Sequence, residues 1–287
     1  MGTPHRPKQT VQEKFSMAVV PEVILHRGNE KNYMEVIDQG GVRSLYFNKK
    51  VVQSRISLEH PQKLLLKYTQ FLMGAALLAC PSPKKVLIIG VGAGALFQFL
   101  HHYFPDCKVE GVDYSLQIIK LARGYFGLPE NDNITIHHSD GLGYLRGLST
   151  DACYDIIIID AFDDRGMAKN IYSNEFFNMA GNHLSPDGII CANLWSGNTE
   201  GLNKVKKAIH KNAKNSVYIP VHKRDNIIAL LFQHELPWHD LCPEEARLRQ
   251  IQAIYNHDID FVRISKSITK NNLRIGERIQ LYFSNKA

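Results

Sequence analysis

Two aspartates, Asp160 and Asp163, stand directly after a run of four isoleucines, and their type and spacing suit proton-transfer chemistry. A carboxylate at the end of an apolar strand can hold a primary amine in line and accept its proton. Burial in a closed pocket helps, because it lowers the pKa of the amine from about 10 toward neutrality. The alternatives are structural: Asp160 would cap the turn that follows it, and Asp163 would be a solvated loop residue.

A second motif is a short apolar strand that runs into three glycines at alternate positions, Gly90, Gly92 and Gly94. Glycines let the backbone turn tightly and approach a ligand, and the free N–H groups of a following helix point at the same place. Asp113 ends the next predicted strand about 20 residues further on, where a carboxylate can bind ribose hydroxyls. We therefore predict a nucleoside site, the alternative being a turn that only packs a strand against a helix.

Strands and helices alternate from about residue 84 to 234, which predicts an α/β fold with a doubly wound, Rossmann-like sheet. We expect strands over 86–89, 108–113, 133–141, 155–160 and 188–193, and a closing hairpin of 216–221 and 226–232. In open sheets of this kind ligands lie beyond the carboxyl ends of the strands. The glycine turn, Asp113, the pair Asp140–Gly141 and Asp160 should therefore face one cleft.

The rest of the chain is assigned around that sheet. Short β-branched runs broken by glycine pairs predict strands over 18–26, 33–38, 42–47 and 51–53. The expected organisation is a flexible tail (1–17), an N-terminal β-lobe (18–60), a Rossmann-like catalytic domain (61–235) that begins with a helix over 61–78, and a helical segment (236–287) that packs on the domain or on a partner subunit.

Composition limits the class of protein. The 287 residues are 44% hydrophobic and 22% charged with a net charge of +6, as in ordinary soluble proteins. Without an apolar run near the roughly 20 residues that cross a bilayer, or a signal peptide, we expect a cytoplasmic protein with no membrane partner. The cysteines and histidines lack metal-ligand spacing, so no metal is predicted. Lysines between 204 and 214 predict a solvated helix face rather than a nucleic-acid contact, because no aromatic residues interrupt them.

Over about residues 33–234 these motifs resemble the spermidine synthase family of aminopropyltransferases, in which a small N-terminal β-lobe precedes a methyltransferase-like Rossmann domain. The positions that carry the resemblance are Gln53, Tyr68, Gly90, Gly92, Gly94, Asp113, Asp140, Gly141, Asp160 and Asp163. The resemblance implies transfer of an aminopropyl group from decarboxylated S-adenosylmethionine to a polyamine or another amine, with release of methylthioadenosine. Family members are often dimeric, so the resemblance also implies a homodimer.

The resemblance assigns roles residue by residue. It implies that Asp160 and Asp163 are catalytic and that Tyr68 contacts the acceptor amine. The residues it places around the nucleoside co-substrate are Gln53, Gly90, Gly92, Gly94, Asp113, Asp140 and Gly141. From its place after the fifth strand, Trp195 is expected to line the acceptor pocket. The residues alone also allow a strand-end polar group at Gln53 and core aromatics at Tyr68 and Trp195. Residues 163–174 are either a lid over the site or a connecting loop.

Four positions depart from the family pattern. Ala93 replaces an aspartate that meets the donor amino group, and Gln70 replaces a glutamate that helps to hold the acceptor. Asp164 replaces a proline, and Val221–His222 falls where a substrate-contacting tyrosine is expected. Two alternatives therefore stay open. One is a methyltransferase that uses intact S-adenosylmethionine, because Ala93 removes a charge that would repel the methionine carboxylate; the other is a non-catalytic nucleoside-binding protein.

Overall fold

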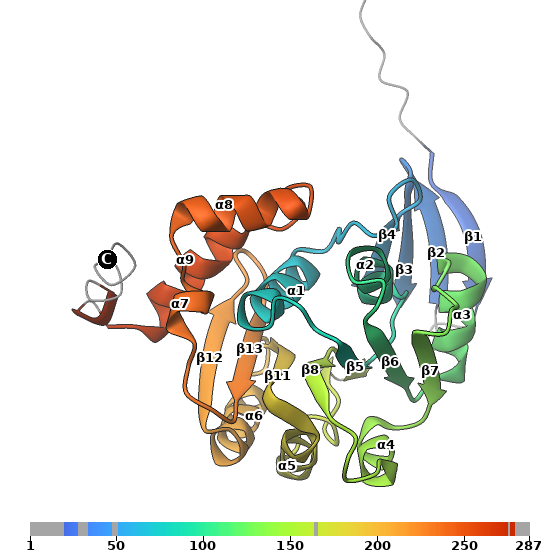
Figure 1. The fold of residues 1–287 in the computed structure, drawn as a ribbon. Coiled ribbons are helices and arrows are strands. Elements are labelled where there is room, and N and C mark those ends of the chain that lie inside the picture. The colour runs from blue at the N-terminus through green and yellow to red at the C-terminus, as the bar shows by residue number, and fades with distance from the viewer. Residues whose placement is uncertain (1–19, 28–33, 48–50, 164–165, 275, 279–287) are drawn as a thin grey trace, which may run out of the picture.

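A seven-stranded mixed sheet forms the centre of the fold (Figure 1). The computed structural model describes residues 20–27, 34–47, 51–163, 166–274 and 276–278. The expected tail over 1–17 and the departure at Asp164 lie outside these ranges, and the side chain of Asp163 is not described.

The strand order of this sheet is β12-β13-β11-β8-β5-β6-β7. The strands are β5 (Lys85–Ile89), β6 (Lys108–Asp113), β7 (Ile134–His138), β8 (Tyr154–Ile159), β11 (Leu184–Trp195), β12 (Asn215–Pro220) and β13 (Asn226–Phe232). All neighbours pair in parallel except β13, which is antiparallel to β11 and to β12. The predicted α/β sheet and its closing hairpin are therefore confirmed. The strand predicted over 133–141 is shorter than expected, because it ends at His138 and Asp140 caps the next helix.

Central strands are apolar throughout because helices cover both faces of the sheet. All four isoleucines of β8, Ile156 to Ile159, have an exposed fraction of 0%. Alternate residues of β5 enter different cores: Val86 and Ile88 join one cluster, and Leu87 and Ile89 join the other.

Two sets of helices enclose the sheet. One face carries α4 (Gly141–Gly147), α5 (Asn174–Asn182) and α6 (Thr199–Asn212). The opposite face carries α1 (Lys67–Ala79), α2 (Ala95–Tyr103), α3 (Leu116–Phe126), α8 (Glu245–Ile254) and α9 (Phe261–Asn272), with the short α7 (Trp238–Leu241) beside them. The C-terminal helices pack on the chain's own domain, because Ile259 and Ile264 lie against α1 at Gly74.

The N-terminal strands form a separate antiparallel sheet in the order β1-β2-β3-β4, as predicted. They are β1 (Glu22–Arg27), β2 (Met34–Gln39), β3 (Val42–Phe47) and β4 (Val51–Ser57). β4 runs beyond its predicted end at residue 53. Leu45 pairs with Ser54 and Tyr46 pairs with Val52, so Gln53 is the extra residue of a β-bulge.

The predicted helix over 61–78 was wrong at its start, because α1 begins at Lys67. Residues 61–66 form turns instead, and Leu64 among them is buried in the core with an exposed fraction of 1%. The backbone carbonyl of Leu64 accepts a hydrogen bond from the Gln70 side chain at 2.7 Å. This contact ties the turn to the first turn of the helix.

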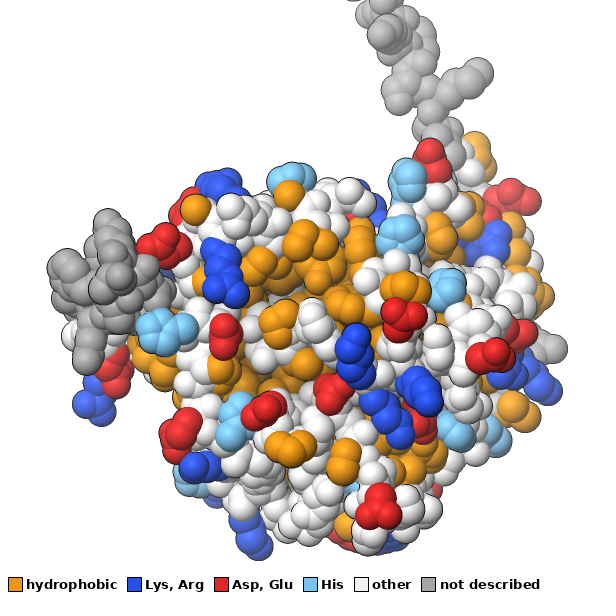
Figure 2. All heavy atoms as spheres, in the orientation of Figure 1, with side chains coloured by type: hydrophobic (Ala, Val, Ile, Leu, Met, Phe, Trp, Pro, Cys, Tyr) orange, Lys and Arg blue, Asp and Glu red, His pale blue; other side chains and the backbone are white. Residues whose placement is uncertain are grey.

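Charged side chains of both signs are interspersed over the face shown in Figure 2. On α6, Lys204 pairs with Glu200 at 2.6 Å, and Lys214 beyond its end pairs with Glu235 at 2.8 Å. These pairs fit a solvated helix face. None of the helices in the described part of the chain combines the length and the apolarity that a membrane span requires.

Candidate active site

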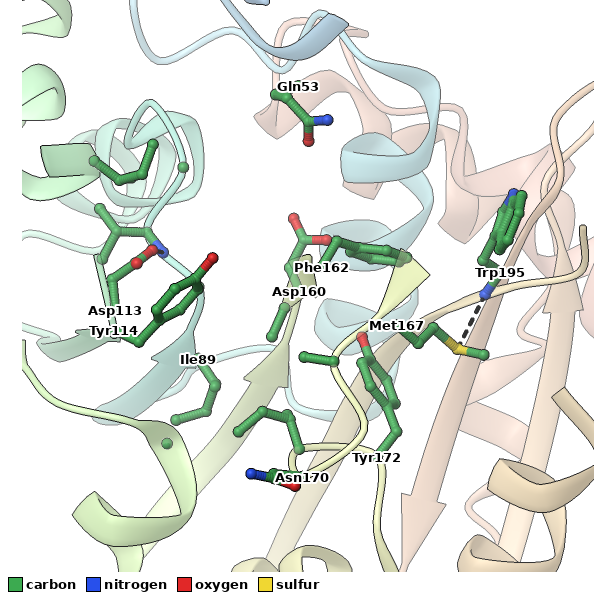
Figure 3. Close-up of a pocket in the computed structure, with 18 of the residues that line it drawn as sticks. Gln53, Ile89, Asp113, Tyr114, Asp160, Phe162, Met167, Asn170, Tyr172 and Trp195 are labelled. Atoms are coloured by element: carbon green, nitrogen blue, oxygen red, sulfur yellow. Dashed lines mark hydrogen bonds between the residues drawn. The ribbon is translucent and has the colours of Figure 1, made fainter. Parts of the chain in front are cut away.

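A cleft of about 980 Å³ opens beyond the carboxyl ends of β5, β6 and β8, under the N-terminal sheet. The predicted site residues that line it are Gln53, Tyr68, Gly90, Gly92, Asp113, Asp140, Gly141, Asp160 and Trp195. Figure 3 shows Asp160 in the middle of the cleft, with Asp113 and Tyr114 on one side and Met167 and Trp195 on the other. The structure thus brings together residues that come from both sheets and from α1.

The glycine turn connects β5 to α2 in a left-handed backbone conformation. Gly90, Gly92 and Gly94 have φ values of +99°, +54° and +82°. A Cβ at Gly90 would collide with the carbonyl oxygen of Asp160, so glycine is required where these two strand ends meet. Gly94 is not part of the cleft lining, and a Cβ there would lie 2.7 Å from Leu128 Cδ1. Gly94 therefore allows close packing of the turn against Leu128.

Asp113 holds the turn from the end of β6. Its Oδ2 accepts the backbone N–H of Val91 and its Oδ1 accepts that of Ser115, both at 2.9 Å. Burial raises the pKa of this carboxyl, and the backbone hydrogen bonds oppose that shift. Each carboxylate oxygen has a second lone pair, so Asp113 can still accept a hydrogen bond from a hydroxyl group of a ligand in the cleft.

Asp140 and Gly141 also line the cleft. Asp140 is exposed and caps α4, with Oδ1 accepting the N–H of Gly143 at 2.8 Å. A Cβ at Gly141 would lie 2.8 Å from Ile89 Cγ2, so the backbone of α4 packs closely on β5. Tyr114, 65% exposed, also lines the cleft here, and the sequence analysis did not single it out.

Asp160 has one hydrogen-bond donor on each carboxylate oxygen. The Tyr68 hydroxyl donates to Oδ2 at 3.2 Å and the Asn193 amide donates to Oδ1 at 2.8 Å. Burial raises the pKa of Asp160, and these two hydrogen bonds hold the rise in check. A carboxylate held in this way is suited to orient an amine and accept its proton.

Asn193 is a residue that the sequence analysis missed. It lies on β11, 2% exposed, and its Oδ1 accepts a hydrogen bond from Asn226 Nδ2 at 2.9 Å. Its backbone carbonyl accepts the Tyr172 hydroxyl at 2.7 Å. The available signal was an asparagine within the apolar run 189–195, where a buried amide needs polar partners.

The segment after Asp160 begins as a small hairpin of β9 (Phe162–Asp163) and β10 (Gly166–Met167). It lies on Trp195: a Cβ at Gly166 would be 3.2 Å from Trp195 Cε3, and the backbone N–H of Trp195 donates to Met167 Sδ at 3.4 Å. The backbone of Asp163 thus lies in the hairpin, opposite Gly166. The catalytic role of the Asp163 side chain stays a prediction.

Three of the four departures from the family pattern lie in the described part of the chain. Ala93 is buried with an exposed fraction of 1% and does not line the cleft. Gln70 does not line it either, because its amide is turned to the carbonyl of Leu64. Val221 is buried at 2% and also lies outside the lining. Among the described residues, none of these positions supplies a charge to the cleft.

Comparison with known proteins places these features in context. Residues 65–229 match the spermine/spermidine synthase domain. The chain is 27% identical over 247 residues to a polyamine aminopropyltransferase of Neisseria meningitidis, covering 86% of this chain and 92% of that protein. It is 32% identical over 204 residues to a polyamine aminopropyltransferase of Chromobacterium violaceum, covering 70% and 76%.

Two further matches are a solved structure and a methyltransferase. A probable spermidine synthase from Corynebacterium glutamicum has the same fold, with a TM-score of 0.67 at 19% identity over 87% of this chain and 95% of that one. The chain is also 31% identical over 140 residues to putrescine N-methyltransferase 2 of Nicotiana tabacum, covering 47% of this chain and 39% of that protein.

Proposed function

This chain belongs to the spermine/spermidine synthase family, and from that premise we propose that it transfers an aminopropyl group from decarboxylated S-adenosylmethionine to a primary amine. The observation that carries the proposal is the carboxylate of Asp160, held between Tyr68 and Asn193 in the middle of the cleft. Polyamine aminopropyltransferases are among the relatives that cover most of this chain.

The reaction requires an amine with a free lone pair. Asp160 takes a proton from the acceptor ammonium, and the amine nitrogen then attacks the propyl carbon next to the sulfonium. A C–N bond forms and the C–S bond breaks, with its electron pair passing to sulfur, so methylthioadenosine leaves. The attack leaves a secondary ammonium, which takes over the positive charge of the sulfonium, and the proton held by Asp160 passes to solvent. Alignment in the cleft supplies the remaining rate enhancement.

The donor nucleoside would lie on the Asp113 side of the cleft. Gly90 and Gly92 have no side chain, so a ligand can approach the backbone there. Asp113 can accept hydrogen bonds from the ribose hydroxyls. Asp140 would accept a hydrogen bond from the adenine amino group. Gln53, the extra residue of the β4 bulge, lines the cleft above Asp160 in the view of Figure 3, and we propose that it contacts the donor. The expected homodimer and the expected cytoplasmic location stay predictions.

Methyl transfer from intact S-adenosylmethionine is the second candidate. The observation that favours it is Ala93, whose buried methyl group leaves the glycine turn without a carboxylate that would attract the donor amine and repel a donor carboxylate. A putrescine N-methyltransferase is among the relatives, although it matches only part of this chain.

Product analysis separates the candidates. Purified protein is incubated with either donor and a panel of primary amines, and products are identified by mass spectrometry. Methylthioadenosine formed only from the decarboxylated donor, and lost in Asp160→Asn, supports aminopropyl transfer. S-adenosylhomocysteine indicates methyl transfer instead. Tight methylthioadenosine binding without turnover of any amine in the panel would refute both.

A further inference from the structure

The N-terminal sheet covers the cleft with two polar side chains that are neighbours on one strand. Gln53 and Ser54 of β4 both line the cleft, together with Leu45 and Phe47 of β3. Neighbouring residues of a regular strand point to opposite faces of the sheet. Gln53 is the extra residue of the β4 bulge, and the bulge lets both polar side chains reach the cleft. These four residues form the roof of the cleft.

Ser54 contributes an unused hydroxyl group to this roof. The residue is 7% exposed, and its Oγ forms no hydrogen bond with another residue in the described part of the chain. Thr69, a second buried residue of the lining, differs in this respect, because its hydroxyl donates to the Leu66 carbonyl at 2.7 Å. A buried polar group without a partner is unfavourable, so the Ser54 hydroxyl is expected to meet a polar group of a ligand.

Ser54 faces the glycine turn from the opposite wall of the cleft. Its Oγ lies 3.8 Å from the position that a Cβ on Gly92 would take. The side chains of the turn itself are apolar, and of these Val91 lines the cleft whereas Ala93 does not. The polar side chain at this point of the cleft is therefore supplied by the roof.

The glycine turn lies between the two carboxylates that the proposed reaction uses. It follows β5, which lies between β6 and β8 in the sheet. On one side Asp113 accepts the backbone N–H of Val91 at 2.9 Å. On the other side the backbone N–H of Asp160 donates to the carbonyl of Ile89 at 2.9 Å. A donor with its ribose at Asp113 and its transferred carbon at Asp160 must therefore cross the turn, with its sulfonium below the roof.

We propose that Ser54 Oγ accepts a hydrogen bond from the ammonium group at the end of the donor's sulfonium side chain. A serine hydroxyl has two lone pairs, and an ammonium group has three N–H donors. This inference rests on the proposed function for the class of donor. It does not depend on which group is transferred, because decarboxylated and intact S-adenosylmethionine both carry this ammonium. Ser54 thus distinguishes the donor from methylthioadenosine, which lacks the side chain.

Binding measurements without an acceptor amine test this directly. Full-length protein is titrated by calorimetry with decarboxylated S-adenosylmethionine, intact S-adenosylmethionine and methylthioadenosine. For the donor that the wild type binds more tightly, Ser54→Ala should raise Kd at least about tenfold, because hydrogen bonds to charged groups are strong. The Kd of methylthioadenosine should change by less than about twofold, and this retained binding shows that the variant is folded.

Two further measurements separate hydrogen bonding from shape and from charge. Ser54→Cys keeps nearly the same shape, but sulfur is a weak acceptor, so this variant should weaken donor binding almost as much as Ser54→Ala does. A sulfonium analogue with a methyl group in place of the aminoalkyl chain keeps the positive sulfur without the ammonium. Ser54→Ala should change the Kd of this analogue by less than about twofold.

A matched control uses a second buried serine of the same sheet. Ser44 lies on β3 with an exposed fraction of 6% and does not line the cleft. Ser44→Ala therefore removes a hydroxyl of similar burial from the N-terminal sheet. It should leave the affinities for the donor and for methylthioadenosine unchanged.

Opposite results are defined. An equal loss of donor and methylthioadenosine affinity in Ser54→Ala would overturn the proposal, because Ser54 would then contact the shared nucleoside or shape the cleft. Unchanged donor affinity would overturn it too. A selective loss of donor affinity, in a protein that transfers neither group to any amine, would support the role of Ser54 and refute the proposed transfer. Aminopropyl transfer with the same kcat and donor KM in Ser54→Ala would do the reverse.

Discussion

Asn193 donates its side-chain amide to Asp160 Oδ1 over 2.8 Å, from β11 to the end of the neighbouring β8. Asn226 on β13 donates to the other end of that amide at 2.9 Å. An asparagine side chain has one donor end and one acceptor end, so Asn226 decides that the NH₂ group of Asn193 faces Asp160. Side chains on β11 and β13 therefore influence the pKa of Asp160, the candidate base at the end of β8.

Asn193→Ala should move the acid limb of the kcat–pH profile to higher pH. The hydrogen bond from Asn193 lowers the pKa of Asp160, so its loss lets burial raise that pKa further. Protonated Asp160 cannot accept a proton, so activity is lost at a higher pH than in the wild type. A hydrogen bond to a charged group contributes about 1.5–3 kcal/mol, which corresponds to roughly 10–100-fold in kcat near the limb. An unchanged limb would contradict this role, and Asn226→Ala should give a smaller shift in the same direction.

Tyr68→Phe should have a milder effect of the same kind. The Tyr68 hydroxyl donates to Asp160 Oδ2 at 3.2 Å, a longer bond than that from Asn193. We expect kcat to fall by up to about tenfold, with the acid limb moved upward by less than in Asn193→Ala. Steady-state kinetics across pH provide the measurement. A raised KM with an unmoved pH limb would instead make Tyr68 a binding residue for the acceptor.

Asp160→Asn should abolish turnover and stabilise the protein at neutral pH. The pKa of Asp160 is raised in the folded state by burial, so the folded protein holds this proton more tightly than the unfolded chain does. Its unfavourable contribution is absent below the ordinary aspartate pKa and grows as the pH rises through the folded-state pKa.

Thermal unfolding at two pH values checks this. The midpoint of Asp160→Asn should exceed that of the wild type at pH 7, by about 2 °C for each kcal/mol gained, and the difference should shrink toward pH 4. A variant less stable than the wild type at pH 7 would show that the charged carboxylate is a net stabiliser.

Gly90→Ala should destabilise the protein and remove nucleoside binding. The left-handed backbone at φ +99° costs a residue with a Cβ about 1–3 kcal/mol, and the methyl group would also displace the carbonyl of Asp160. Gly124→Ala is the control, because Gly124 lies in α3 with nothing within 4 Å of its Cβ position. That substitution should be neutral or stabilise by up to about 1 kcal/mol. Denaturant unfolding and methylthioadenosine titration give both quantities, and a Gly90→Ala variant that still binds the nucleoside would refute the close-approach argument.

Ala93→Asp should favour the decarboxylated donor. A carboxylate in the glycine turn attracts a donor amine and repels a donor carboxylate, so the ratio of kcat/KM for decarboxylated over intact S-adenosylmethionine should rise about tenfold or more. Because Ala93 is 1% exposed, the variant should also be less stable, and its folding must be verified by circular dichroism. If the kcat/KM ratio of the folded variant equals that of the wild type, residue 93 does not determine the choice of donor.

Local sequence patterns were sufficient for the elements that carry the site. The isoleucines of β8 and the apolar run of β5 predicted buried strands, and the alternating glycines predicted a tight turn between β5 and α2, which the structure shows to be left-handed. Where helix signals were weaker the prediction was wrong, as at residues 61–66. There Leu64 enters the core and the chain turns before α1, since burial outweighs a helical spacing of apolar residues.

The sequence by itself determined the strand ends and the carboxylates that they deliver, because strand and turn propensities act between near neighbours. Only the tertiary structure decided the environment of those carboxylates. Asn193 reaches Asp160 from a strand 33 positions further along the chain, and Tyr68 reaches it across 92. Trp195 lies against Gly166 through the packing of a hairpin. Such contacts depend on which strands become neighbours in the sheet, and that depends on the free energy of the whole core rather than on any one segment.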